Sequence, residues 1–95
     1  MRLSKQEVQA IQTNFKKFFN EGEIYLFGSR VDDKKKGGDI DLYISTSNKE
    51  NIYEKKLQFL IHLKREIGEQ KIDIVIDNHQ NRLIDIVAKE EGIRL

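Results

Sequence analysis

The sequence predicts one small domain of the α/β class, more narrowly α+β, in which a mixed β-sheet is flanked by helices over residues 1–95. Two observations lead to this fold class. Segments with apolar residues at helical spacing follow segments in which polar and apolar residues alternate, in the order helix, strand, helical turn, strand, helix, strand, helix. A length of 95 residues leaves room for a single hydrophobic core.

The first helix is predicted to begin at residues 4–7, which have the pattern of a capping box in which Ser4 and Glu7 cap each other's backbone. Gly22 is expected to end this helix. Its apolar residues recur at helical spacing and are expected to form core: Val8, Ile11, Phe15, Phe18 and Phe19.

A second capping box, residues 47–50 from Ser47 to Glu50, is predicted to begin a long helix that ends near Gly68. A last helix is expected to run from about Asn81 to Gly92. The residues of the long helix that are expected to face inward are Ile52, Tyr53, Leu57, Leu60, Ile61, Leu63 and Ile67.

Three strands are predicted, at residues 24–27, 39–45 and 72–77, with a brief helical turn at residues 28–30 between the first two. In the second and third strands aspartates alternate with aliphatic residues, which is the pattern of a strand with one buried face. The predicted topology therefore exposes the aspartates on one face of the sheet.

Composition and charge argue against several classes of protein. The net charge of +1 argues against a protein whose main task is to grip nucleic acid, because phosphate binding usually requires a basic excess. The absence of cysteine excludes disulfides, thiolate zinc sites and thiol nucleophiles. Since neither an apolar signal segment nor an apolar run of membrane-spanning length is found, we expect a cytoplasmic protein.

Asp39 and Asp41 are the first candidates for a functional site. Residues two apart in a strand project from the same face, so the two carboxylates stand side by side, about 7 Å apart along the backbone. They repel each other unless a cation lies between them, and a hard divalent ion such as Mg²⁺ removes that repulsion. Without other evidence, two aspartates in this pattern more often form only the solvent face of an edge strand.

Gly28 and Ser29 make a catalytic interpretation stronger. A glycine at the end of the first strand leaves space for a phosphate, and a serine that begins a helical turn can donate its hydroxyl beside free N–H groups. Arg30 follows directly and is a further phosphate candidate, although a surface salt bridge would explain it equally. A phosphate-binding turn beside paired carboxylates is the arrangement that phosphoryl transfer requires.

Asp73 is the expected third carboxylate. It alternates with Ile72 and Ile74 in the third strand, and adjacent strands lie about 4.8 Å apart, so Asp73 can reach the site of Asp39 and Asp41. Asp77 shares its face but lies about 13 Å further along the strand, and it ranks well below Asp73.

The pattern of Gly28-Ser29, a spacer, Asp39-x-Asp41 between hydrophobic residues, and a later Asp73 resembles the DNA polymerase beta-type nucleotidyltransferase superfamily, whose fold is a polymerase beta-like palm. The short length resembles its minimal nucleotidyltransferase (MNT) members. The resemblance covers nearly the whole chain, and it departs from the usual pattern in Val31 in place of alanine and Gly38 in place of serine.

The resemblance implies an Mg²⁺-dependent nucleotidyltransferase that uses ATP. Gly28, Ser29 and Arg30 would bind the nucleotide, and three catalytic aspartates would hold two Mg²⁺ ions: Asp39, Asp41 and Asp73. In the superfamily the third carboxylate helps to activate the acceptor hydroxyl, which makes Asp73 the candidate general base.

The acceptor is expected to be a partner molecule, because a chain of this length has no separate acceptor-binding domain. Similar MNT proteins, the MntA-like group, are antitoxins of HEPN/MNT toxin–antitoxin pairs and can transfer AMP to a tyrosine of a HEPN-domain ribonuclease toxin. This chain would then be a protein adenylyltransferase with a HEPN-type partner. Two alternatives remain open: an antitoxin that acts by binding alone, and a nucleotidyltransferase with a nucleic-acid acceptor. Homo- or hetero-oligomers are compatible with the small core.

Other polar residues carry less weight. The lysines of the charged spacer 32–36 could meet phosphates, but a solvated loop explains them at least as well. His62 is expected to be partly buried within the long helix, and His79 lies in a polar loop where contact with a nucleotide is the less common outcome.

Overall fold

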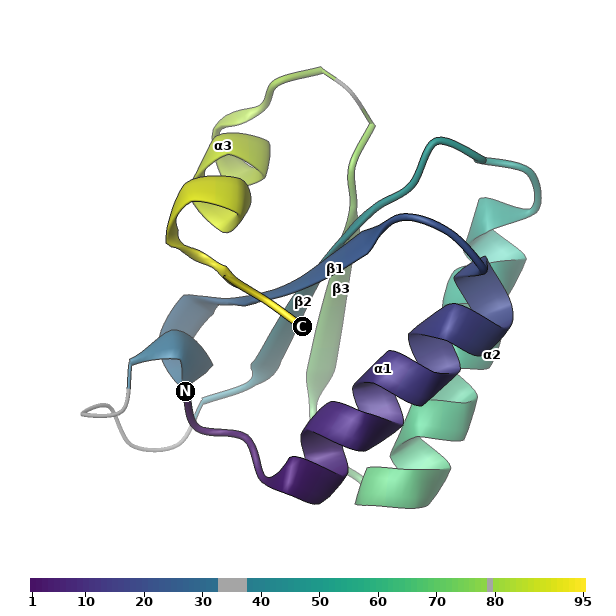
Figure 1. Cartoon of the computed structure of the whole chain (residues 1–95), viewed down its shortest axis with the longest axis vertical. Helices are drawn as coiled ribbons and strands as arrows, with labels where there is room; N and C mark the ends of the chain where they lie inside the picture. The colour runs from purple at the N-terminus through teal and green to yellow at the C-terminus, as the bar shows by residue number, and fades with distance from the viewer. Residues whose placement is uncertain (33–37, 79) are drawn as a thin grey trace.

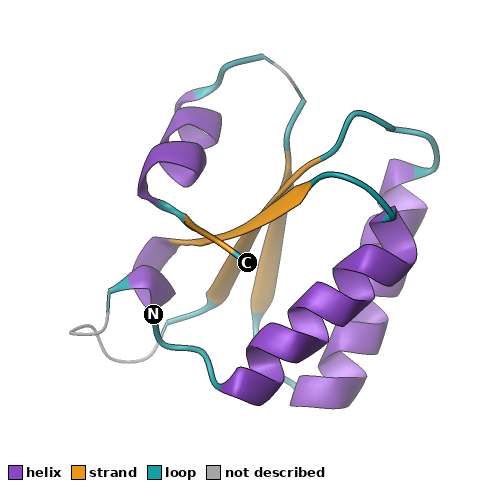
Figure 2. Ribbon diagram, in the orientation of Figure 1, coloured by secondary structure: helices purple, strands orange, loops and turns teal. Residues whose placement is uncertain are grey.

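The elements of the fold follow the predicted order, with one short strand added at the end (Figures 1 and 2). The computed structural model covers residues 1–95, and it describes residues 1–32, 38–78 and 80–95, apart from the side chain of Ser29. The helices and strands are α1 (Lys5–Phe19), β1 (Glu23–Phe27), the 3-10 turn η1 (Gly28–Val31), β2 (Ile40–Ser45), α2 (Ile52–Ile67), β3 (Ile72–Ile76), α3 (Leu83–Glu91) and β4 (Ile93–Arg94).

The four strands form one mixed sheet in the order β3-β2-β1-β4. β1 pairs antiparallel with β2 and with β4, whereas β2 and β3 are parallel. A parallel pair requires a crossover, and α2 provides it between β2 and β3. The fold class predicted from the sequence, a small mixed sheet flanked by helices, is confirmed.

The hydrophobic core lies between the sheet and the pair α1 and α2, which lie side by side in Figure 1. The strands contribute alternate residues, such as Ile24, Leu42 and Ile74, because alternate side chains share a face. Phe15 and Phe19 of α1 stack with ring centroids 5.4 Å apart, as core residues of the kind that the helical spacing predicted. α3 covers part of the opposite face of the sheet (Figure 1).

The first capping box is confirmed. The Ser4 backbone N–H donates to Glu7 Oε1 at 2.8 Å, and the Glu7 N–H donates to Ser4 Oγ at 3.1 Å. The chain leaves α1 at Asn20, whose φ of 67° is left-handed. α1 therefore ends before Gly22, at an asparagine, the residue other than glycine that most readily adopts this conformation.

The second capping box is wrong. α2 begins at Ile52, with Asn51 in the cap position and no side-chain cap. Ser47 instead donates its hydroxyl to Glu21 Oε2 at 3.2 Å, while the backbone N–H groups of Ser47 and Asn48 donate to Glu21 Oε1, each at 3.1 Å. A carboxylate from the α1–β1 connection thus occupies the groups that the local pattern assigned to a helix start.

The predicted inward face of α2 is only partly correct. Leu63 is buried, but Tyr53, Leu57 and Ile61 are exposed, and Phe59, which the pattern omitted, is fully buried. Apolar residues occur around most of α2, so their spacing did not identify the side that faces α1 and the sheet.

Two smaller findings complete the fold. β4 had not been predicted, since a two-residue strand has no detectable alternation; it pairs through Tyr25↔Arg94 and Leu26↔Ile93. None of the helices in the described part of the chain has the length and hydrophobicity needed to span a lipid bilayer.

Candidate active site

Asp41 and Asp73 face each other across the parallel strands β2 and β3. The register pairs Asp41 with Asp73, and the neighbouring pair Ile40↔Ile72 is buried on the core face. Paired residues of adjacent strands project from the same side of a sheet, so the two carboxylates share the face opposite the core. The sequence pattern had predicted this shared face, and the register adds that the two residues are direct neighbours.

Asp39 lies immediately before β2, two residues from Asp41. Its carboxylate forms an ion pair with Lys71 Nζ at 3.4 Å, in which both side chains are substantially exposed. An exposed pair of this kind contributes little stability, because water screens it and both side chains lose freedom. Asp39 is therefore held only weakly by Lys71 and remains accessible to a divalent cation.

The surroundings of Asp41 disfavour its ionised form. Burial raises the pKa of Asp41, and the nearby charges of Asp73 and Asp39 raise it further, while Lys71 partly opposes the shift. Like charges gathered on a partly buried surface disfavour ionisation, and a bound cation would remove that penalty. The three aspartates thus form one electrostatically coupled cluster.

The donor chemistry of this cluster suits a hard divalent cation, since every candidate ligand is a carboxylate oxygen. The side chains are not arranged as a preformed coordination group: among residues 1–32, 38–78 and 80–95, no three acidic, histidine or cysteine side chains stand at metal-ligand spacing. The three aspartates therefore supply suitable oxygen donors for the expected metal site, but their side chains do not stand at ligand spacing.

Gly28 is packed directly against Asp41. It begins η1 with a φ of 78°, and a Cβ atom added there would overlap Oδ2 of Asp41. The β1–β2 register explains the closeness, because the preceding residue, Phe27, pairs with Asp41. The sequence suggested that glycine leaves space for a phosphate; in the fold it also leaves space for the central carboxylate.

The turn after β1 is present as predicted, in the form of the 3-10 helix Gly28–Val31. Ser29 lies in this turn, and its side chain falls outside the part that the structure describes. Arg30 is engaged with the backbone: its Nη1 donates to the carbonyl of Arg2 at 2.9 Å and its Nε to that of Gly38 at 3.3 Å. Arg30 thus ties the N-terminus and the start of the β2 segment to the turn.

The remaining candidate residues are the lysines of the spacer and the two histidines. The lysines of the spacer and His79 lie outside the described residues. His62 is half-buried as expected, with its ring 4.8 Å from that of Phe18 and its Nδ1 2.9 Å from the Gln58 carbonyl.

A second polar cluster, which sequence reasoning missed, lies further along the same face of the sheet under α3. The buried Tyr43 donates its hydroxyl to Asp85 Oδ1 at 2.9 Å, and Arg82 Nη2 contacts the same oxygen at 3.0 Å. Burial raises the pKa of Tyr43, and the hydrogen bond to Asp85 adds to the shift. The alternation of Asp41, Tyr43 and Ser45 was a usable signal for a polar face that continues along β2.

Asp77 belongs to this second cluster. It is 2% exposed, pairs with Lys89 at 3.1 Å, and accepts a hydrogen bond from Ser45 Oγ at 3.3 Å. A buried carboxylate compensated by a lysine and a hydroxyl satisfies its charge within the fold. Asp77, which was expected to rank well below Asp73 as a candidate, is thus paired within the second cluster.

Comparison with known proteins bears on what this arrangement does. The family model described as polymerase beta, nucleotidyltransferase, matches residues 9–95. The chain belongs to this nucleotidyltransferase family. The matched segment contains every element from β1 to β4, together with the aspartate cluster and the turn at Gly28.

A solved structure supports the assignment of a nucleotidyltransferase domain. A crystal structure described as that of a candidate nucleotidyltransferase superposes with a TM-score of 0.62 at 25% sequence identity, over 93% of this chain and 96% of that one. None of the curated proteins matches the chain significantly. The family indicates nucleotidyl transfer, a reaction that in such domains generally uses a nucleoside triphosphate and a divalent metal.

Proposed function

We propose that this nucleotidyltransferase domain transfers AMP from ATP, with Mg²⁺, to a hydroxyl of a partner protein. The observation that carries the proposal is the direct pairing of Asp41 with Asp73 beside Asp39, with Gly28 packed against Asp41. Burial and the charges of Asp73 and Asp39 raise the pKa of Asp41, which is costly to the fold, and carboxylates perturbed in this way cluster at functional sites.

In the proposed site, Asp39 and Asp41 would hold two Mg²⁺ ions, and Asp73 would complete the set of carboxylate ligands. The cation supplies positive charge to the triphosphate when it is bound. The turn at Gly28, Ser29 and Arg30 binds the phosphates.

The proposed reaction is an in-line displacement at the α-phosphorus of ATP. The acceptor oxygen forms a bond to this phosphorus, the bond to the bridging oxygen breaks, and pyrophosphate leaves. Asp73 accepts the proton of the acceptor hydroxyl. Its exposure on the strand face makes it accessible to an acceptor that approaches from solvent.

A protein acceptor is favoured by charge. The net charge of +1 gives little attraction for a nucleic-acid backbone. The partner that the MNT resemblance implies is a HEPN-domain ribonuclease toxin, which makes the domain an antitoxin that adenylylates its toxin.

The test uses ATP labelled at either the α- or the γ-phosphate, Mg²⁺, and the protein encoded beside this chain. We expect the partner protein to acquire the α-label and not the γ-label. In the variant Asp39→Ala/Asp41→Ala, labelling of the partner should fall at least 100-fold. Glu90→Gln, an exposed change on α3, serves as the matched control and should leave labelling unchanged.

The other outcomes contradict the proposal in distinguishable ways. An unlabelled partner whose toxicity is still suppressed by the double variant would identify an antitoxin that acts by binding alone. Label on RNA in place of protein would identify a nucleic-acid acceptor, and transfer of γ-label would identify a different reaction.

A further inference from the structure

A groove runs along the outer edge of β3. β3 is the last strand in the order β3-β2-β1-β4, so no strand within the described residues pairs with this edge. The groove has a volume of about 550 Å³. One side is formed by residues 74–78, and Ile52, Tyr53 and Lys56 of α2 and Arg82 form the flanks. Asp39, Asp41 and Asp73 do not line it.

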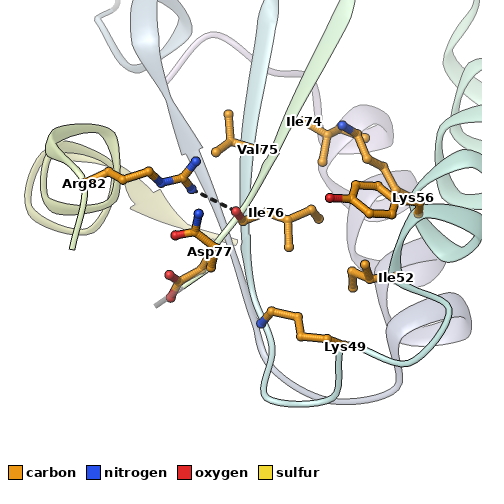
Figure 3. A pocket seen from close by; sticks show the side chains of 10 residues that line it. Lys49, Ile52, Lys56, Ile74, Val75, Ile76, Asp77 and Arg82 are labelled. Carbon is orange, nitrogen blue, oxygen red and sulfur yellow. Dashed lines mark hydrogen bonds between the residues drawn. The ribbon is translucent and has the colours of Figure 1, made fainter. Parts of the chain in front are cut away.

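The backbone of β3 offers hydrogen-bonding groups to this groove. The Lys71 carbonyl accepts from the Ile40 N–H at 3.1 Å, and the Asp77 N–H donates to the Ile44 carbonyl at 2.8 Å, so odd-numbered residues of this segment bond toward β2. Since backbone groups alternate in direction along a strand, those of Ile74 and Ile76 point outward. Arg82 Nη2 donates to the Ile76 carbonyl at 3.0 Å, which agrees with that direction (Figure 3).

The outward groups therefore form a short template for one more strand. Buried backbone groups need partners, and an edge strand with free N–H and C=O groups pairs readily with an extended chain. The Ile74 N–H and C=O and the Ile76 N–H are positioned for such pairing, while Arg82 occupies the Ile76 carbonyl at the end of the groove.

The walls of the groove are apolar with a cationic rim. Figure 3 shows Ile52 and Ile76 near its centre, with Lys49, Lys56 and Arg82 around them. Tyr53, whose side chain is 80% exposed, adds aromatic surface.

The side chains that line the groove carry more positive than negative charge. Asp77 is the one acidic residue among the described residues of the lining, and it is buried and paired with Lys89. Arg82 is paired with Asp85, so the excess comes from Lys49 and Lys56. The groove therefore complements a segment that carries both aliphatic and acidic side chains.

We infer that this groove binds an extended, acidic segment of a partner protein, which adds a strand to the outer edge of β3. Backbone hydrogen bonds to Ile74 and Ile76 supply affinity, and carboxylates near Lys56 supply specificity. The inference rests on the groove alone and does not require nucleotidyl transfer.

A second copy of the chain fits this edge less well. Antiparallel pairing of two β3 strands about Val75 would place Asp73 of one copy opposite Asp77 of the other. Each copy would also contribute a groove lining in which positive charge exceeds negative charge. Like charges that oppose each other directly across strands are destabilising, so charge favours an acidic partner.

The binding test uses a fluorescein-labelled eight-residue peptide in which valine and glutamate alternate, with a valine–lysine peptide as control. Fluorescence anisotropy reports binding, and NMR-detected hydrogen exchange reports protection of individual amides. We expect the acidic peptide alone to bind and the Ile74 and Ile76 amides to exchange at least tenfold more slowly in the complex.

Two pairs of variants locate the binding. Lys56→Glu should weaken binding roughly tenfold, while Lys16→Glu, the same charge reversal on α1, should change it less than twofold. Tyr53→Ala should weaken it about fivefold and Leu57→Ala should not, because Leu57 lies on the same helix outside the groove. Tyr53 and Leu57 are exposed, so both alanine variants retain the fold.

Four results would overturn the inference. Equal binding of the acidic and basic peptides would remove the charge complementarity, and binding without added protection of Ile74 and Ile76 would place the peptide elsewhere. Protection of these amides in a free protein of dimer mass would assign the edge to a second copy. Displacement of the peptide by ATP alone, with chemical-shift changes confined to the groove, would assign it to a nucleotide.

Discussion

Gly28 connects the turn and the carboxylates at the level of single atoms. Its left-handed φ of 78° strains any residue with a Cβ, and the added atom would also overlap the Asp41 carboxylate. Gly68 has a similar φ of 94°, but a Cβ there meets nothing within 4 Å. The two glycines thus separate the effect of backbone strain from the effect on the site.

For Gly28→Ala we expect a loss of about 1–3 kcal/mol of unfolding free energy and at least a tenfold loss of nucleotidyl transfer. Gly68→Ala should lose stability through the same backbone strain and keep its transfer rate. Urea denaturation and the α-label assay measure the two effects. Equal activity of the two variants would show that Gly28 does not position Asp41.

The ionised Asp41 side chain should lower the unfolding free energy of the protein when no metal is bound. Its pKa is raised in the fold by burial and by Asp73 and Asp39, so the ionised form is disfavoured there at neutral pH. We expect Asp41→Asn to raise the unfolding free energy at pH 7 by up to about 1 kcal/mol while abolishing transfer. A decrease in stability, measured by urea denaturation without added metal, would contradict the repulsion inferred for the cluster.

Replacing Asp85 with asparagine should change the unfolding free energy in the opposite direction to Asp41→Asn. Hydrogen bonds from Arg82 lower its pKa against the effect of burial, and Tyr43 adds a further hydrogen bond. Asp85→Asn should therefore reduce the unfolding free energy at pH 7 by about 1.5–3 kcal/mol, because a charge-assisted buried network is lost. The same urea titration measures it, and Tyr43→Phe should lose less, since only one hydrogen bond disappears.

At the scale of elements, apolar residues of α2 differ in whether they are buried in the core or exposed to solvent. Phe59 is fully buried, with its ring 5.8 Å from that of Phe19, whereas Leu57 is 54% exposed. Phe59→Ala should cost about 3–5 kcal/mol through lost burial and the cavity that remains. Leu57→Ala should change stability by less than about 0.5 kcal/mol. Equal costs, measured by chemical denaturation, would mean that the free protein buries the outer face of α2.

At the scale of the whole molecule, acid should destabilise the domain through carboxyl groups whose pKa lies below the ordinary value. Among the described residues these include Glu7, Glu21 and Asp85. Burial opposes the shift of Glu7, but hydrogen bonds from Ser4 and Gln70 outweigh it. The hydrogen bond from Thr46 is the main cause at Glu21, and the one from Arg82 at Asp85.

The stability that these groups contribute is complete above the unfolded-state pKa of about 4 and is lost as the pH falls through the lower folded-state values. Asp41 acts in the opposite direction, because its folded-state pKa is raised. We expect the melting temperature to fall between pH 5 and pH 3, and to fall less in Asp85→Asn. A melting temperature that stays constant over this range would contradict the ionised networks.

Local chain geometry was sufficient to predict the class of fold and the shared face of the aspartates. Alternation with period two sends Asp41 and Asp73 to the side opposite Ile40 and Ile72 in any sheet that buries the isoleucines. The α1 cap at Ser4 and Glu7 was equally predictable, because both partners lie within one helical turn.

Other features depended on residues far apart in the chain. Ser47 joins Glu21 across 26 positions, and Tyr43 joins Asp85 across 42, so no local pattern could reveal either contact. The direct opposition of Asp41 and Asp73 required β2 and β3 to be neighbours in register, and the exposure of Tyr53 required a choice of which side of α2 meets α1. Backbone periodicity is a property of consecutive residues, whereas register and facing are set by what the rest of the chain packs against them.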